Sequence, residues 1–195
     1  MKPGAAFYIW HPDSGGLTFR DAILRAGLTV RQCLIWNKNA LVLGRQDYQW
    51  KHEPCLYGWK DGAAHYFDES RSEATVIPDG EEVDPKKLQK EELVALCTQL
   101  LAEDRKTTVI DEDKPSRSEE HPTMKPIRLM ARLIKNSTRP DETVLDTFGG
   151  SGSTLIACEQ LRRRCCMMEI DPRYCDVIIT RWETLTGGKA VLLDV

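Results

Sequence analysis

The sequence lacks long apolar runs, and this absence limits where the protein can act. No stretch approaches the ~20 apolar residues that a membrane-spanning helix requires, and the first residues lack the apolar core and cleavage site of a signal peptide. We therefore expect a cytoplasmic protein without a membrane partner. Hydrophobic residues make up 41% and charged residues 29% of the 195, which is typical of a folded domain of ordinary size rather than a disordered chain.

Metal-binding cysteine patterns are also missing. The seven cysteines are odd in number, contain no Cys-x-x-Cys pair, and are adjacent only at Cys165 and Cys166. We expect buried, reduced thiols and no metal site.

The chain has no overall basic excess, since its net charge is -3 and its pI is near 5.9. That balance argues mildly against a dedicated nucleic-acid binder, although binding needs only a local basic face. One expected helix carries such a face, formed by Lys125, Arg128, Arg132, Lys135 and Arg139. These side chains and the run Arg162, Arg163 and Arg164 either contact phosphates or lie on a solvated surface.

Residues 1–67 combine strand patterns with one amphipathic helix. Strands are expected at 5–10, 29–38 and 52–60, and a helix is expected at 17–27. The last two strands suggest an antiparallel pair. Residues 68–121 are polar and acidic apart from a leucine-rich helix pattern at 85–103, and we interpret them as an insertion of helix and loop.

From residue 122 onward, helices and strands alternate. Helices are expected at 125–136, 153–161 and 171–187, and strands at 143–148, 162–170 and 190–195. This alternation predicts a parallel sheet with right-handed crossovers and therefore an α/β fold.

The strongest local signal is VLDTFGGSGST at 144–154, a glycine-rich turn between an expected strand and an expected helix. Such a turn lets the backbone approach a ligand closely. The dinucleotide fingerprint fails here, because its third glycine is replaced by Leu155. Glu169 stands 19 residues after Gly150, at the expected end of the next strand. In doubly wound folds an acid at that place accepts hydrogen bonds from ribose hydroxyls.

Together with HPTMKP at 121–126 and MEIDPRYCDVIITRWETLTG at 168–187, this turn resembles the amino-group DNA methyltransferases of bacteria and phages. The resemblance is to the group whose cofactor motifs follow the catalytic motif. It implies a Rossmann-like methyltransferase fold, S-adenosyl-L-methionine as cofactor and double-stranded DNA as partner. By position it assigns the cofactor pocket to Thr123, Lys125, Pro126, Asp146, Phe148, Gly150, Gly152 and Glu169.

Two earlier segments, CLIWNK and HEPCLYGWK, resemble the part of these enzymes that borders the target base. The resemblance makes Trp36, Lys38, His52 and Glu53 candidates for contacts near a flipped nucleotide. Trp36 either stacks on that base or is a core tryptophan of a strand, and the sequence does not decide between the two.

The family's catalytic tetrapeptide, Asp-Pro-Pro-Tyr or Ser-Pro-Pro-Trp, is absent, because the sequence contains no Pro-Pro. The exocyclic amine of adenine is a poor nucleophile, so transfer needs an acceptor and a stacking aromatic from that loop. We therefore expect a fragment whose fold lacks the central catalytic strand and which is inactive alone. A missing N-terminal segment or a second chain would supply the motif.

The resemblance implies a domain layout and a reaction. Residues 1–67 form the half that faces the target base, 68–121 are a possible target-recognition region, and 122–195 form the cofactor-binding half. The expected reaction is methylation of adenine N6.

Four alternatives to adenine methylation stay open. They are cytosine-N4 methylation, a non-catalytic DNA-binding prophage remnant, an RNA or small-molecule methyltransferase, and a cytosine-C5 enzyme using Cys55. The last is disfavoured because Pro54-Cys55 precedes the glycine turn, whereas the C5 family places its nucleophile after it.

Overall fold

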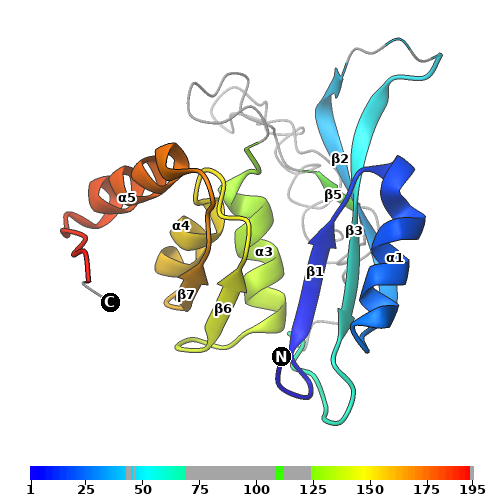
Figure 1. Ribbon diagram of the computed structural model, residues 1–195, viewed down its shortest axis with the longest axis horizontal. Helices are drawn as coiled ribbons and strands as arrows, with labels where there is room; N and C mark the ends of the chain where they lie inside the picture. The colour runs from blue at the N-terminus through cyan, green and yellow to red at the C-terminus, as the bar shows by residue number, and fades with distance from the viewer. Residues whose placement is uncertain (43–44, 46, 69–108, 112–123, 194–195) are drawn as a thin grey trace, which may run out of the picture. The chain divides into compact units, whose positions relative to one another are not determined.

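The computed structural model describes residues 1–42, 45, 47–68, 109–111 and 124–193 (Figure 1). The chain divides into two compact units, residues 1–113 and 114–195, and each is described by itself. The described strands form a four-stranded sheet in the first unit and a two-stranded sheet in the second. No helix in these described ranges is both long and apolar enough to cross a membrane.

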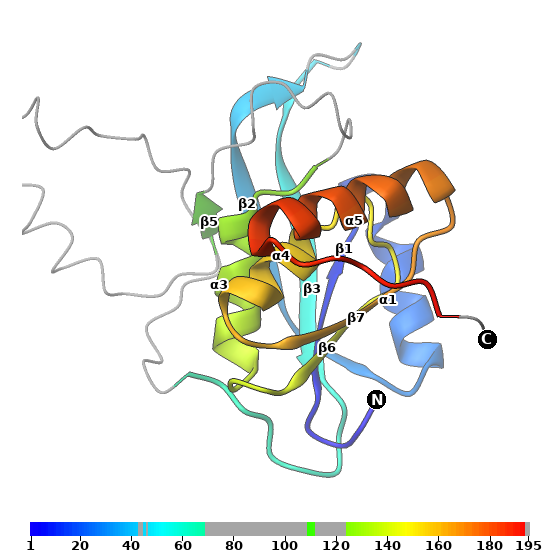
Figure 2. The ribbon, with the colours of Figure 1, turned by 90° about the vertical axis from the view of Figure 1, so that its left-hand side faces the viewer.

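The first unit is built on a mostly antiparallel sheet with the order β1-β3-β2-β5. Its elements are β1 (Ala6–Trp10), the short 3-10 helix η1 (Asp13–Gly15), α1 (Gly16–Arg25), β2 (Thr29–Val42), β3 (Trp50–Trp59) and β5 (Val109–Asp111). Strand β3 pairs antiparallel with both β1 and β2, which confirms the expected antiparallel pair. The C-terminal end of β2 and the N-terminal end of β3 pair with each other and extend past the end of β1 (Figure 2).

Strand β5 corrects one expectation. Residues 109–111 fall inside the stretch 68–121 that we interpreted as helix and loop, yet they pair in parallel with β2 through Ile35, Trp36 and Asn37. A three-residue strand is too short to show a period in the sequence, so its pairing partner defines it. The helix expected at 85–103 lies outside the described residues.

Helix α1 covers one face of this sheet, and their contact forms the core of the first unit. Phe7, Ile23 and Leu56 are the buried centre, and Phe19 and Val30 pack around them. These side chains come from β1, α1, β3 and β2, so one apolar cluster joins four elements. Burial of this kind supplies most of the stability of a small domain.

The second unit packs its helices against a parallel pair of strands. Its elements are α3 (Ile127–Ser137), β6 (Thr143–Asp146), α4 (Ser153–Gln160), β7 (Arg164–Met167) and α5 (Pro172–Thr186). The register sets Asp146 opposite Met167, and the parallel pairing of β6 and β7 agrees with the parallel sheet expected for this half.

The core of the second unit lies on one face of its sheet. Ile134 of α3 and Ala157 and Cys158 of α4 are buried there, with Val144 and Cys165 of the strands packed against them. Side chains on a strand alternate between faces, so Leu145 and Cys166 point the other way and are exposed.

Two further expectations change in this half. Residues 190–193 do not form the expected strand, and Val191, Leu192 and Leu193 are exposed. An apolar run becomes a strand only when a neighbour pairs with it, and no described strand does so here. Of the arginine run, Arg163 donates to the carbonyl of Thr138 at 2.7 Å, so this side chain ties two loops together.

The thiols partly follow expectation. All six described cysteines are free, and Cys55 and Cys158 are buried, but Cys166 is exposed because of the strand alternation.

We predict that Gly58→Ala destabilises the first unit. A Cβ at this position of β3 would lie 2.2 Å from the Thr29 carbonyl oxygen and 2.7 Å from the Phe7 ring. Since a backbone oxygen cannot move cheaply, the expected loss of unfolding free energy is about 1–3 kcal/mol, measured by urea denaturation. Gly16→Ala is the control, because its Cβ meets only ordinary contacts at 3.5 Å. Equal effects of the two changes would contradict the steric argument.

Candidate functional site

The glycine turn between β6 and α4 holds its shape through backbone geometry. Gly150 and Gly152 have φ angles of 52° and 79°, in the left-handed region that favours glycine. A Cβ at Gly152 would also lie 3.1 Å from Ile178 of α5. The Gly149 amide donates to the Met168 carbonyl at 2.9 Å, which fastens the turn to the end of β7.

Asp146 organises this turn from within. One carboxylate oxygen accepts from the Phe148 amide at 3.0 Å, and the other accepts from the Thr154 hydroxyl at 2.6 Å. The carboxylate therefore spans the turn and fixes both of its ends. The Thr154 contact was not anticipated, because it joins two side chains eight positions apart that only the folded turn brings together.

Glu169 points at the turn, as the spacing from Gly150 led us to expect. Its Oε2 accepts from the Gly150 amide at 2.7 Å, and its Oε1 accepts from the Ile170 and Asp171 amides at 2.8 and 3.0 Å. These donors, with Asp171 and Gly150 contributing most, hold the pKa of the carboxyl below its ordinary value. The side chain is therefore an anion at neutral pH.

The segment 124–126 is fastened to the same turn from the other side. The Ser153 hydroxyl donates to the Lys125 carbonyl at 2.7 Å. Arg181 of α5 donates to the Ser151 carbonyl and approaches the Met124 sulfur at 3.6 Å. Pro126 is buried directly before α3. Thr123 lies outside the described residues.

Sequence reasoning missed Arg181. It contacts residues 30 and 57 positions away, and its side chain gives no pattern that would single it out among the 27 basic residues. The contact becomes visible only when α5 is placed beside the turn.

Three exposed apolar side chains lie in the glycine turn or directly after the end of β7. Phe148 is 87% exposed and Ile170 is 98% exposed, and Met168 also faces solvent. All three follow the carboxyl ends of β6 and β7, where ligands bind in open α/β sheets. Exposed apolar groups at such an edge are typical of a binding surface.

The four base-side candidates come from neighbouring stretches of β2 and β3 in the first unit, where Trp36, Lys38 and Glu53 share one face of the strand pair and His52 projects from the other. Trp36 is opposite Glu53 in the β2–β3 register, and Asn37 is opposite His52. The Lys38 ammonium lies 3.0 Å from the Glu53 carboxylate and 5.1 Å from the centre of the Trp36 ring.

Trp36 sits in the core of its unit. Its ring is only 2% exposed and packs edge-on against Trp10 at 6.1 Å. This position matches the core alternative for Trp36, and stacking on a base would require its cover to move.

Cys55 is fully buried within β3. A covalent nucleophile must reach its substrate, so this environment further disfavours the cytosine-C5 alternative.

Solved methyltransferases share this fold. The chain aligns with M1.HpyAVI, solved in complex with SAM, at a TM-score of 0.66 and 23% identity, over 93% of this chain and 76% of that one. It aligns with the cytosine-N4-specific PvuII DNA methyltransferase at a TM-score of 0.59 and 19% identity, over 93% of this chain and 65% of that one. The expected Rossmann-like fold of S-adenosylmethionine-dependent methyltransferases is thereby confirmed.

Within that class, the chain belongs to the N6/N4 DNA methylase family, whose model matches residues 1–180. The type II methyltransferase M2.MboI of Moraxella bovis is 38% identical over 66 residues, which are 34% of this chain and 24% of that protein. M.Cfr9I of Citrobacter freundii is 38% identical over 56 residues, 29% of this chain and 19% of that protein. The matched part is therefore about a quarter or less of these relatives.

We predict that Glu169→Gln lowers stability in a pH-dependent way. Because the folded-state pKa lies below the ordinary glutamate value of about 4.3, the carboxylate stabilises the fold above that value and loses this effect as the pH falls through the folded pKa. The difference in unfolding free energy between wild type and variant should be constant above about pH 5 and shrink below about pH 4. Urea denaturation across this range measures it, and a pH-independent difference would contradict the assignment.

Arg181→Met should loosen the turn. The change keeps much of the side-chain volume but removes a charged donor to the Ser151 carbonyl, which we expect to cost about 1–3 kcal/mol and to speed amide exchange at Gly150 and Gly152. Arg173→Met on the same helix is the control, since that side chain is exposed and its ion pair within the described residues is with Asp171. Equal exchange rates in the two variants would refute the role of Arg181.

Proposed function

We propose that the second unit binds S-adenosyl-L-methionine, and that the chain is part of a site-specific DNA methyltransferase acting on adenine N6 in double-stranded DNA. The observation that carries this proposal is the Glu169 carboxylate held against the Gly150 amide. An anionic acid beside a glycine turn is the arrangement that recognises the ribose of a nucleoside ligand.

The residues present fit this cofactor. A carboxylate has about four acceptor sites, and three at Glu169 receive amides, so one is left for a ribose hydroxyl. The exposed side chains of Phe148, Met168 and Ile170 offer an apolar surface to the adenine ring.

The turn at 148–152 and the segment 124–126 would hold the methionine part of the cofactor. When bound, the cofactor supplies a methyl group that its positive sulfur has already activated. The chain's own task is then to orient the donor, and orientation of this kind lowers a barrier substantially.

The first unit would border the target base with Trp36, Lys38, His52 and Glu53. Lys38 and Glu53 neutralise one another at 3.0 Å, so we assign them to positioning rather than to proton transfer. His52 lies against Trp50 at 5.5 Å, on the other face of the strand pair from Trp36, so we assign it to contacts on that face.

Transfer requires a group that this sequence does not contain. With no Pro-Pro anywhere, the acceptor for the amine hydrogens must come from another segment or from a second chain. We propose that the isolated chain binds the cofactor but does not methylate. We place its action in the cytoplasm.

Adenine is preferred through the family likeness. Cytosine N4 is the second candidate, and the alignment with the cytosine-N4-specific PvuII enzyme favours it. The two targets present the same kind of exocyclic amine, so the described residues suit both. The relatives named type II methyltransferases support a role in restriction and modification.

Calorimetry with S-adenosyl-L-methionine tests the proposal. We expect saturable binding to the full chain and a loss of about tenfold or more in Glu169→Gln, because the neutral amide loses a charge-assisted hydrogen bond. Glu183→Gln is the matched control on α5, since the Glu183 carboxylate accepts from Lys189 and the Ala190 amide, away from the glycine turn, within the described part of the chain. No binding by a folded wild-type chain would overturn the proposal.

The transfer step has its own assay. A polypeptide carrying Asp-Pro-Pro-Tyr is added to the chain with labelled cofactor and duplex DNA. Nucleoside analysis then distinguishes N6-methyladenine, the expected product, from N4-methylcytosine.

A further inference from the structure

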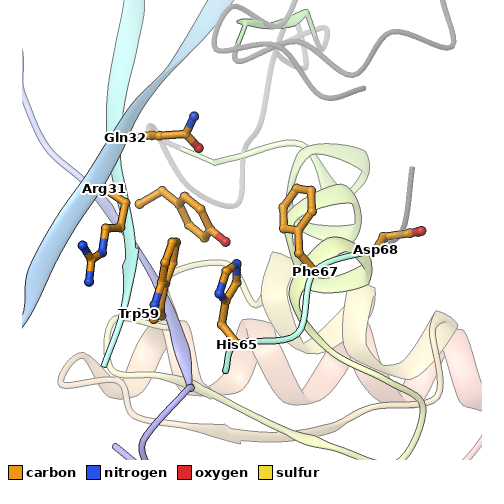
Figure 3. Close-up of a pocket in the computed structure, with 7 residues that line it drawn as sticks. Arg31, Gln32, Trp59, His65, Phe67 and Asp68 are labelled. Carbon is orange, nitrogen blue, oxygen red and sulfur yellow. The ribbon is translucent and has the colours of Figure 1, made fainter. Parts of the chain in front are cut away.

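The first unit carries a cavity that none of the roles above uses. It encloses about 610 Å³ beside the ends of β2 and β3 (Figure 3). It is lined by Arg31, Gln32, Tyr57, Trp59, His65, Phe67 and Asp68. None of the base-side candidates is among these lining residues. Gln32 and Tyr57, the lining residues nearest to them along the strands, are four residues from Trp36 and Glu53, or about 13 Å at the rise of a strand.

One wall of the cavity is a preformed stack. The Trp59 and His65 rings are parallel to within 13° at 3.7 Å, and the Arg31 guanidinium lies 4.9 Å from the centre of the Trp59 ring. Figure 3 shows Arg31 and His65 on opposite sides of the indole. Both faces of the Trp59 indole are therefore covered. The His65 imidazole is the last ring of the stack, and it lines the cavity.

The stack is held in place from the backbone. The β2–β3 register shifts between Val30 and Gln32, so Arg31 is the extra residue of a bulge. Bulges of this kind redirect side chains, often next to functional sites. The Arg31 guanidinium is fixed by the Asp61 carboxylate at 2.6 Å, and Thr29 donates to the same carboxylate at 3.2 Å.

The charge of the cavity disfavours an anion. Arg31 is neutralised by Asp61, and a second carboxylate, that of Asp68, lies on the rim. Burial, assisted by the charge of Arg31, lowers the pKa of His65 below its ordinary value of about 6.5, so its ring is neutral at pH 7. None of the described lining groups thus offers a spare positive charge for a phosphate.

The opening instead suits a flat, neutral ring. In Figure 3 the Gln32 amide lies above the His65 and Phe67 rings, and all three residues line the cavity. The amide carries both donors and an acceptor, which is the complement of a heterocycle edge. Aromatic faces combined with such an edge are the common means of holding an unstacked base.

We propose that this cavity holds an unstacked nucleobase of the bound DNA, distinct from the base that is methylated. The inference rests on the proposed function for its source of bases. One lining residue, Asp68, is the first residue of the segment 68–121 that the sequence analysis interpreted as a possible target-recognition region. Binding of a base in this cavity would make the affinity of the chain for DNA depend on a nucleotide other than the one that is methylated.

A duplex with one unpaired 2-aminopurine, compared with its fully paired counterpart, tests the proposal on the full chain. We expect tighter binding of the bulged duplex and quenching of the 2-aminopurine fluorescence as it stacks. Phe67→Leu should weaken the preference for the bulged duplex about 5- to 100-fold, in line with the loss of one stacking contact. Tyr48→Leu, at a 91% exposed aromatic outside the cavity, should leave it unchanged.

Gln32→Met provides a second variant at an exposed position, should Phe67→Leu fail to fold. It should reduce the preference among the four bases at the unpaired site. Equal binding of bulged and paired duplexes, or quenching that survives the cavity variants, overturns the proposal. So does quenching that saturating S-adenosyl-L-methionine abolishes, because the ring bound here would then be the cofactor's adenine.

Failure of this inference is separable from failure of the proposed function. If the chain binds the cofactor in calorimetry but does not prefer the duplex with the unpaired base, only the proposal of a second base site is refuted. If the chain binds the unpaired base but not the cofactor, only the assignment of S-adenosyl-L-methionine as its ligand is refuted.

Discussion

The hydrogen bond from the Gly150 amide to the Glu169 carboxylate joins two residues 19 positions apart, and the candidate cofactor site depends on it. It links the turn after β6 to the end of β7. Asp146 holds the inside of the turn through Phe148 and Thr154, and Arg181 holds its outside through Ser151. The turn is therefore organised by its own protein groups, so a ligand need not order it, and preorganisation of this kind favours binding.

The sheets of the two units differ in strand direction and in the side chains that they carry. The parallel pair β6–β7 ends in the turn and the acid, which is the edge where open α/β sheets bind nucleoside ligands. The antiparallel set β1-β3-β2 carries the aromatic side chains, among them Trp36, which is buried, and Trp59, which belongs to a stack. The proposed roles of the two units, cofactor binding and contact with the target base, therefore rest on different kinds of side chain.

Periodicity and turn chemistry identified most of the second unit from the sequence, because its helices and strands alternate and its glycine turn is unmistakable. They also placed Glu169 toward Gly150. They failed at 190–193 and 109–111, where a strand exists only if a partner pairs with it. They missed Arg181 and Thr154, whose roles arise from tertiary contacts. The burial of Trp36 was left open, since an aromatic on a strand looks the same in a core and in a binding site.

The saturation of Glu169 has a consequence for selectivity. Its carboxylate already accepts three amide hydrogens, so a sugar that presents two neighbouring hydroxyls must displace one amide to engage both. The hydrogen bond from the second hydroxyl then replaces an existing bond from an amide, so the carboxylate gains no additional bond. Discrimination between ribose and deoxyribose at this acid consequently reflects a difference between two similar bonds, and it is smaller than the strength of either one.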